Sequence, residues 1–230
     1  MLRLWGSAVL VLCGLVSACD VASGDSATGD GLGLKAAPQV SASAVAGAEG
    51  LGREVIGDGD VDGFSVTVPA AYGVVRQQDV RVAQSACGSA GYALSGTVVG
   101  KPTSTVVRKA SGEGAVVTVV LAEYVGEQAQ GAMGDLSAVV SECAGGFAVT
   151  VNGEERKVGK VAAEIAPAGA DQAMALGAVV ESGGVKTPVK VVVLRKGATV
   201  GYISAVPADK ADRDFAVPTA VLDAQLVKLG

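Results

Sequence analysis

Apolar and polar residues alternate with a period of two along much of the chain beyond residue 61. This alternation, and the short apolar runs beside it, indicate β-strands with at least one buried face. The segments with these patterns are residues 64–68, 105–109, 115–121, 147–151, 178–181, 189–194 and 198–206. The sequence therefore predicts a domain rich in β-structure.

Turn residues between these segments predict antiparallel hairpins. Ser111-Gly112-Glu113-Gly114 joins one pair of strands, and Arg195-Lys196-Gly197 joins another. Asn152-Gly153 is the strongest two-residue hairpin signal, and it predicts a return strand over residues 157–165.

Helical periodicity is clearest over residues 127–143, and Gly145-Gly146 ends that pattern. One apolar stripe is formed there by Met133, Leu136, Val140 and Cys143. A short helix is predicted over residues 87–94. Pro218 lies early in a predicted last helix, which has an apolar face of Leu222, Leu226 and Leu229. Together these elements predict an α+β fold: a single domain with a mainly antiparallel sheet covered by two or three helices.

The N-terminus has the pattern of a bacterial lipoprotein signal. Arg3 precedes an apolar run of about 13 residues, which is too short to cross a bilayer. Leu15-Val16-Ser17-Ala18-Cys19 resembles a lipobox, in which the cysteine is acylated and the preceding signal is removed. We therefore expect residues 1–18 to be a signal peptide and Cys19 to anchor the protein in the cell membrane, on its extracytoplasmic face. An ordinary signal cleaved after Ala18 is the alternative.

Residues 19–60 are mostly Ala, Gly, Ser and Asp, without an aromatic side chain. Such a composition buries little apolar surface, so we expect a disordered tether after the lipidated cysteine. The folded domain is then expected over residues 61–230, a length sufficient for one hydrophobic core.

Cys13 leaves with the signal and Cys19 carries the lipid, which leaves Cys87 and Cys143. In an oxidising compartment these two most simply form a disulfide. The bridge would close a loop of roughly 55 residues, stabilise the fold by about 4 kcal/mol and pin the long helix to the short one. Two free thiols, one of them catalytic, are the alternative.

The chain contains no histidine, which removes the usual general base and every Ser-His-Asp or Cys-His arrangement. Catalysis would have to use carboxylates or a Ser-Lys pair, and no matching motif is present. An enzyme is therefore disfavoured, and no cofactor is expected. A cell-envelope hydrolase remains the alternative, with four unpaired candidate carboxylates: Glu123, Glu142, Glu154 and Glu164.

The net charge of the chain is −5, and basic residues do not cluster. Nucleic acid is therefore not an expected partner. Asp58, Asp60 and Asp62 match the first half of a calcium loop, D-x-D-x-D-G. Because Pro69 occupies the position of the bidentate glutamate, a solvated acidic turn is favoured over a calcium-binding structural role.

Two further groups of residues have both a functional and a structural interpretation. Arg195-Lys196-Gly197 could bind a partner, but charge at a hairpin tip is normally just solvated. The three tyrosines Tyr92, Tyr124 and Tyr202 could line a pocket. In a chain with only 3% aromatic residues, we favour a core role for them.

Short segments in a characteristic order resemble a known family. They are residues 86–87 (Ala-Cys), 92–96 (Tyr-Ala-Leu-Ser-Gly), 106–108 (Val-Val-Arg), 121–124 (Leu-Ala-Glu-Tyr), 141–143 (Ser-Glu-Cys), Phe147, 193–198 (Val-Leu-Arg-Lys-Gly-Ala) and 221–229 (Val-Leu-Asp-Ala-Gln-Leu-Val-Lys-Leu). The chain resembles actinobacterial sensor-domain lipoproteins, which are related to the extracellular domain of PknH-type receptor kinases.

The resemblance implies an antiparallel sheet with flanking helices, a disulfide and an extracytoplasmic cleft for a ligand. This chain lacks the second disulfide of kinase-linked members, and the family's Gly-Asp-Glu turn appears only as Gly169-Ala170-Asp171-Gln172. The expected function is therefore a membrane-anchored, non-catalytic sensor-like domain that binds a small ligand or a cell-envelope partner.

Overall fold

The computed structural model describes residues 42–209 and 215–230, with side chains from residue 47 onward. The predicted signal peptide, Cys19 and residues 19–41 lie outside this part of the chain. Among the described residues, no helix has both the length and the apolar character needed to span a bilayer.

Ten strands form a single sheet in which every pair is antiparallel, in the order β1-β3-β4-β10-β9-β8-β6-β5-β2, with β7 also paired to β8. The strands are β1 (Phe64–Thr67), β2 (Val80–Val82), β3 (Ser104–Gly112), β4 (Ala115–Glu123), β5 (Phe147–Val151), β6 (Glu154–Val158), β7 (Ala162–Glu164), β8 (Gln172–Ser182), β9 (Val185–Lys196) and β10 (Thr199–Pro207). The α+β class and the antiparallel sheet that the sequence predicted are confirmed.

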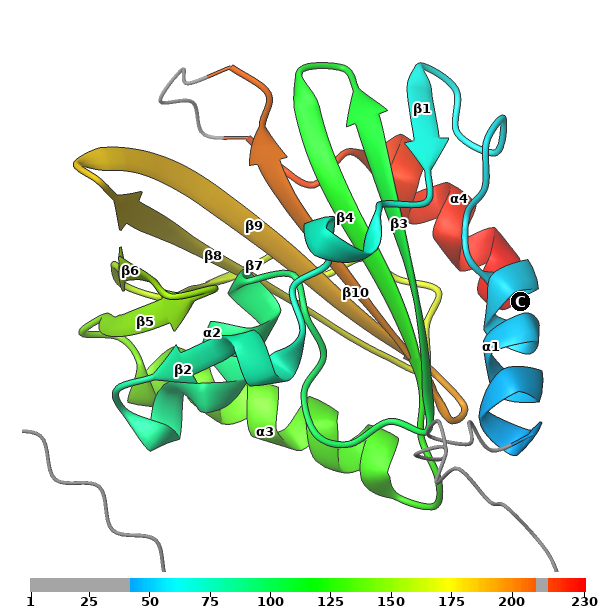
Figure 1. Ribbon diagram of the computed structural model, residues 1–230, viewed down its shortest axis with the longest axis horizontal. Helices are drawn as coiled ribbons and strands as arrows, with labels where there is room; N and C mark the ends of the chain where they lie inside the picture. Colours follow the sequence, from blue (N-terminus) through cyan, green and yellow to red (C-terminus); the bar gives the residue numbers. More distant parts are fainter. Residues whose placement is uncertain (1–41, 210–214) are drawn as a thin grey trace, which may run out of the picture. The chain divides into compact units, whose positions relative to one another are not determined.

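Alternation along the central strands gives the sheet two apolar faces. On β4, Val117, Val119 and Leu121 belong to one buried cluster, while Val120 and Ala122 belong to the other. Two helices cover each face (Figure 1). The described chain thus has four α-helices, where the sequence predicted two or three.

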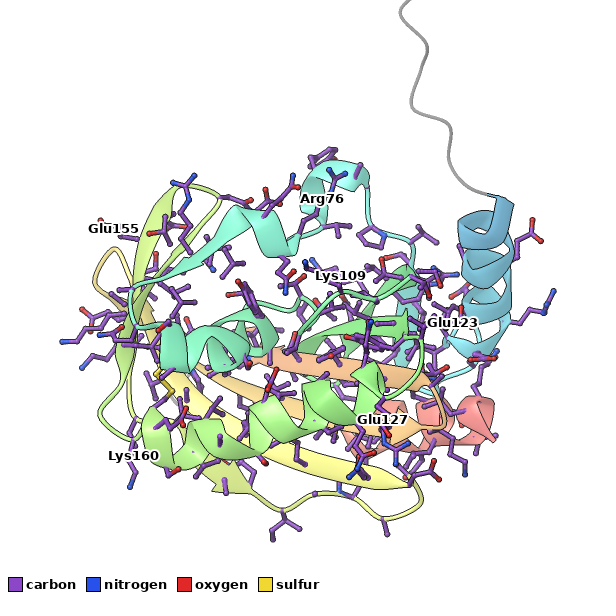
Figure 2. All side chains as sticks on the ribbon, turned by 90° about the horizontal axis from the view of Figure 1, so that it is seen from below. Arg76, Lys109, Glu123, Glu127, Glu155 and Lys160 are labelled. Carbon is purple, nitrogen blue, oxygen red and sulfur yellow. A yellow bond between two sulfur atoms is a disulfide. The ribbon has the colours of Figure 1, made fainter. Side chains whose placement is uncertain are left out.

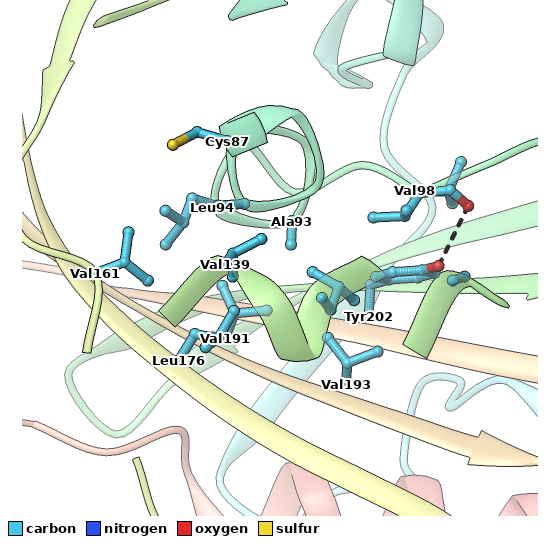
Figure 3. Packing of buried hydrophobic residues seen from close by; sticks show 14 of the residues in the cluster. Cys87, Ala93, Leu94, Val98, Val139, Val161, Leu176, Val191, Val193 and Tyr202 are labelled. Carbon is cyan, nitrogen blue, oxygen red and sulfur yellow. Dashed lines mark hydrogen bonds between the residues drawn. The ribbon is translucent and has the colours of Figure 1, made fainter. Parts of the chain in front are cut away.

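Helices α2 (Gly88–Leu94) and α3 (Gln128–Glu142) cover one face, which we call the α2/α3 face. Cys87 and Cys143 form the predicted disulfide beside them, with their Cα atoms 5.7 Å apart. Figure 3 shows Leu94 and Val139 in the same apolar layer as Leu176 and Val191 of the sheet. Val139, which the predicted stripe omitted, is fully buried, whereas Val140 is half-buried.

Helices α1 (Ala42–Glu54) and α4 (Thr219–Leu229) cover the opposite, α1/α4 face. Helix α1 corrects the predicted tether, because residues 42–60 belong to the folded unit. Leu51, Val55 and Ile56 are at most 2% exposed and pack in the same cluster as Leu121 and Val221. These few apolar side chains of an Ala- and Gly-rich stretch suffice because α4 and the sheet bury them.

The predicted strand over residues 157–165 is wrong in its bounds. The chain forms β6 directly after the Asn152-Gly153 turn and then β7, with residues 159–161 between them. Val158 pairs with Val180 and Ala162 with Gly177, so the β6–β7 side carries one residue more than β8. This extra residue is a β-bulge, which splits one expected strand into two. Strand β8 is also longer than the four residues predicted. The prediction missed its first half because the Ala and Gly residues there show little apolar alternation.

Candidate functional site

A cleft of about 420 Å³ lies on the α2/α3 face, beyond the C-terminal end of α2. We call it the sheet-face cleft. It is lined by Leu94, Ser95 and Gly96 after α2, and by Thr118, Val149, Glu154, Arg156, Val158, Val180, Ser182, Thr187, Val189, Ser204 and Val206 from the sheet. The cleft therefore combines an apolar floor with convergent hydroxyl and charged groups, as small-molecule sites do.

Gly96 brings the segment after α2 close to the sheet. Its φ is +73°, a conformation that favours glycine, and a Cβ added there would lie 3.2 Å from the Ser204 hydroxyl. This part of the cleft wall thus depends on a residue without a side chain.

Three polar side chains form a chain of contacts at the β6–β8 wall. Arg156 Nη2 donates to Glu154 Oε2 at 3.0 Å, and the Ser182 hydroxyl donates to Glu154 Oε1. The Ser182 hydrogen bond and the Arg156 guanidinium lower the pKa of Glu154, so its carboxylate stays ionised near neutral pH.

The Nε–H of Arg156 is buried and has no hydrogen-bond partner among the described residues. The whole side chain is 32% exposed, so other atoms of Arg156 reach solvent while this donor does not. Buried donors are nearly always satisfied, and an exception needs an explanation.

Two other hollows differ from this cleft in their lining. A more open depression of about 730 Å³ shares Arg156 with the cleft and is lined by both charge types, including Arg81, Glu155 and Lys157. A slot of about 320 Å³ between β7 and α4 is almost wholly apolar, with the Glu164–Lys190 ion pair at its edge.

The candidate calcium ligands do not converge. Asp60 accepts a hydrogen bond from the Gly57 N–H and pairs with Lys228 Nζ at 2.7 Å, which together lower its pKa. Asp58 and Asp62 are exposed in the same loop. Within the described part of the chain, no three His, Cys, Asp or Glu side chains gather in a group that could hold a metal.

The four candidate catalytic carboxylates lie on different elements. Glu123, at the end of β4, accepts a hydrogen bond from Ser104, and Glu142 ends α3. Glu154 lines the sheet-face cleft, whereas Glu164 lines the apolar slot. Figure 2 places Glu123 and Glu155, the neighbour of Glu154, at opposite ends of the sheet. The structure therefore does not bring Glu123 and Glu154 together as an acid–base pair.

Two parts of the family resemblance meet at one hairpin. Asp171 accepts the Gly197 N–H at 2.8 Å, and the Arg195 Nε donates to Gln172 Oε1 at 2.7 Å. Arg195 also donates to the Gly197 carbonyl. The Arg195 guanidinium is thus held within the β9–β10 hairpin and is not simply solvated. These contacts give the Asp171-Gln172 turn and Arg195 a structural role.

The buried tyrosines are core residues, as favoured from the sequence. Tyr124 Oη lies 2.7 Å from Tyr202 Oη, and the Tyr124 hydroxyl donates to the Val99 carbonyl. Desolvation raises the pKa of both phenols, so they remain neutral donors and acceptors. Tyr92 is half-buried and packs against the same cluster.

Arg156 is a lining residue of the cleft that the sequence analysis did not single out. The two-residue periodicity of the strand did indicate that Arg156 faces inward. Val158 is buried, and Arg156 lies two residues before it on the same strand, hence on the same inward face. Only the long-range pairing of β6 with β8 shows that this face borders a cleft.

No family model matches the chain, and no curated protein matches it either. Solved structures similar to it include an uncharacterised protein, the Rv0999 ortholog, from Mycobacterium smegmatis (15% identity, 84% of this chain and 98% of that chain covered, TM-score 0.40). Another is the extracellular domain of PknH from Mycobacterium tuberculosis (9% identity, 83% and 89% covered, TM-score 0.41). The PknH-type domain named by the sequence resemblance is thus among the matching structures.

Proposed function

We propose that this chain is a lipid-anchored extracytoplasmic protein whose folded domain is a non-catalytic, sensor-like binding module. Its ligand, a small molecule or a group of a cell-envelope partner, binds in the sheet-face cleft. The proposal rests on one observation. The lining of a cleft of suitable size combines an apolar floor, several hydroxyl groups and Arg156, whose buried Nε–H has no partner among the described residues. The lipobox around Cys19 supports the anchor, and the disulfide supports an oxidising location.

The ligand proposal is tested on the mature chain beginning at residue 19, with Cys19→Ser to prevent acylation. The protein is incubated with an extract of cell-envelope small molecules, washed and analysed by mass spectrometry after denaturation. The matched variant is Ser204→Trp, which fills the cleft, or Thr118→Trp should the first variant fail to fold.

We expect a molecule to be retained by the Cys19→Ser protein and lost from the cleft-filling variant. Equal retention by the two proteins would show that the molecule binds outside the cleft. No retention by either protein would count against a binding role. Turnover of a cell-wall glycan or ester by the same preparation would overturn the non-catalytic assignment. The anchor is tested separately by intact-mass analysis of the native protein, where a mature form without fatty acids would refute it.

A further inference from the structure

The buried Nε–H of Arg156 has no hydrogen-bond acceptor among the described residues. Arginine stays protonated in proteins, so this donor cannot be relieved by losing its proton. Strand β6 is hydrogen-bonded to β5 on one side and to β8 on the other, which fixes the backbone that carries Arg156. The backbone that places Arg156 in the lining of the cleft is therefore fixed before any ligand arrives.

Glu154 cannot take this hydrogen bond without giving up another. Its Oε2 accepts from Arg156 Nη2, and its Oε1 accepts from Ser182. Nε and Nη2 form one edge of the guanidinium, where a carboxylate normally binds both N–H groups at once. Glu154 occupies only half of that edge, and the other half is left for an incoming oxygen.

The charges at this wall select the kind of acceptor. Glu154 and Arg156 neutralise each other, since their side chains form an ion pair at 3.0 Å. A single negative charge gains a charge-assisted hydrogen bond from Nε, whereas a dianion would be repelled more strongly by the ionised Glu154. The wall thus fits a monoanionic group such as a carboxylate.

The rest of the cleft fits an apolar body. Its floor contains five valines from five strands: Val149, Val158, Val180, Val189 and Val206. No aromatic ring lines it, so the stacking that commonly holds sugar rings and bases is missing. Hydroxyls of Thr118, Thr187 and Ser204 add short polar contacts along the same surface.

Building on the proposed function of the sheet-face cleft, we propose that its ligand is an amphipathic monocarboxylate whose acid group binds Arg156. The apolar body lies on the valine floor, and one carboxylate oxygen accepts from Nε. A fatty-acyl chain and the C-terminus of an apolar peptide share this chemistry, and the probes below distinguish them.

The experiment is calorimetric titration of the mature Cys19→Ser chain with two matched pairs of probes. Octanoate is compared with octanamide, and N-acetyl-leucyl-leucine with its C-terminal amide. Within each pair the apolar body is the same, and the amide replaces the carboxylate by an uncharged group of similar size. The titrations are repeated with Arg156→Gln, and with Arg108→Gln as a control that makes the same change of charge on β3, outside the cleft lining.

We expect the acid of one pair to bind at least about tenfold more tightly than its amide, the gain of one charge-assisted hydrogen bond. Arg156→Gln should abolish this preference and leave the amide unchanged, while Arg108→Gln should alter neither. The pair that shows the effect identifies the source as acyl or peptide. Arg156→Gln removes only the exposed ion pair with Glu154, so the melting temperature of the protein should fall little, and its measurement separates lost binding from lost folding.

Two results would overturn the inference. If acid and amide bind equally, and Ser204→Trp abolishes both, the cleft is a ligand site but the carboxylate assignment is wrong. If none of the four probes binds, the monocarboxylate class is wrong. The proposed function is tested separately, by whether the molecule retained by the Cys19→Ser protein is lost from the Ser204→Trp variant.

Discussion

Each face of the sheet is covered by a pair of helices. The two helices of a pair are joined to each other, and the two pairs use different chemistry. On the α2/α3 face, a disulfide joins Cys87, at the start of α2, to Cys143, at the end of α3. On the α1/α4 face, Gln225 of α4 is fully buried; it accepts the Ile56 N–H and donates to the Glu54 carbonyl. One layer is held by a covalent bond between distant residues, and the other by hydrogen bonds at the end of a helix.

The difference follows from the lengths of the helices and from the backbone groups that each pair of helices buries. Helix α2 is only seven residues long and cannot be stable by itself, so a cross-link compensates for its small contact area. Helices α1 and α4 are longer, and the backbone groups at the C-terminal end of α1 need partners when they are buried. Gln225 supplies a donor and an acceptor at once. The cleft lies on the covalently fixed face.

The largest effect should come from breaking the covalent layer. The double variant Cys87→Ser/Cys143→Ser should lose about 4 kcal/mol of unfolding free energy, because the cross-link no longer restricts the unfolded chain. Urea denaturation measures the loss. Adding a reductant to the unmodified protein should give the same shift, and a loss below about 1 kcal/mol would contradict the account.

A core truncation in the opposite layer tests whether α1 belongs to the folded unit. Leu51→Ala should cost about 2–4 kcal/mol, because Leu51 is 2% exposed and its removal leaves a cavity. The same denaturation assay measures this cost. If α1 were part of a disordered tether, the substitution would have no effect.

The hydrogen-bonded contact between α1 and α4 is tested by Gln225→Leu. The Ile56 N–H and the Glu54 carbonyl would lose their partner, which should cost about 1–3 kcal/mol. Val227→Ala on the same helix is the control, since Val227 is 81% exposed and should stay within about 0.5 kcal/mol. Equal losses in both variants would show that Gln225 acts only through general helix packing.

The smallest effect should come from the surface ion pair between Lys228 and Asp60. Lys228→Met should cost about 0.5 kcal/mol at neutral pH and low salt. Because Lys228 lowers the pKa of Asp60, this contribution is full above the ordinary value of 3.8 and is lost as the pH falls through the lowered value. Stability measured against pH should therefore show the two proteins converging in acid. A difference that persists there, or in high salt, would exclude an electrostatic origin.

Much of the sheet was predictable because its signals are local. Two-residue turns specify hairpins through backbone conformation alone: Asn152 and Gly153 both have positive φ, as the expected turn type requires. Glu113 and Gly114 behave in the same way between β3 and β4. Alternation then assigns the faces of each strand, and the cysteine count assigns the disulfide.

Helix α1, β8 and the site were less accessible to such reasoning. Large apolar residues are few in and just after α1 and are separated by Ala and Gly, so local composition indicates disorder, although tertiary packing buries Leu51, Val55 and Ile56. The roles of Asp171 and Gln172 depend on Arg195 and Gly197, more than 20 residues away along the chain.

Turns, strand faces and the cysteine pairing follow from the order of residues, because each depends on neighbours along the chain or on a simple count. The sheet-face cleft has no such basis. Its lining runs from Leu94 to Val206, and only the pairing of distant strands brings Arg156, Thr118 and Ser204 to one surface. Whether a charged side chain is solvated or held unsatisfied beside a cleft depends on those long-range contacts, which leave no periodic trace in the sequence.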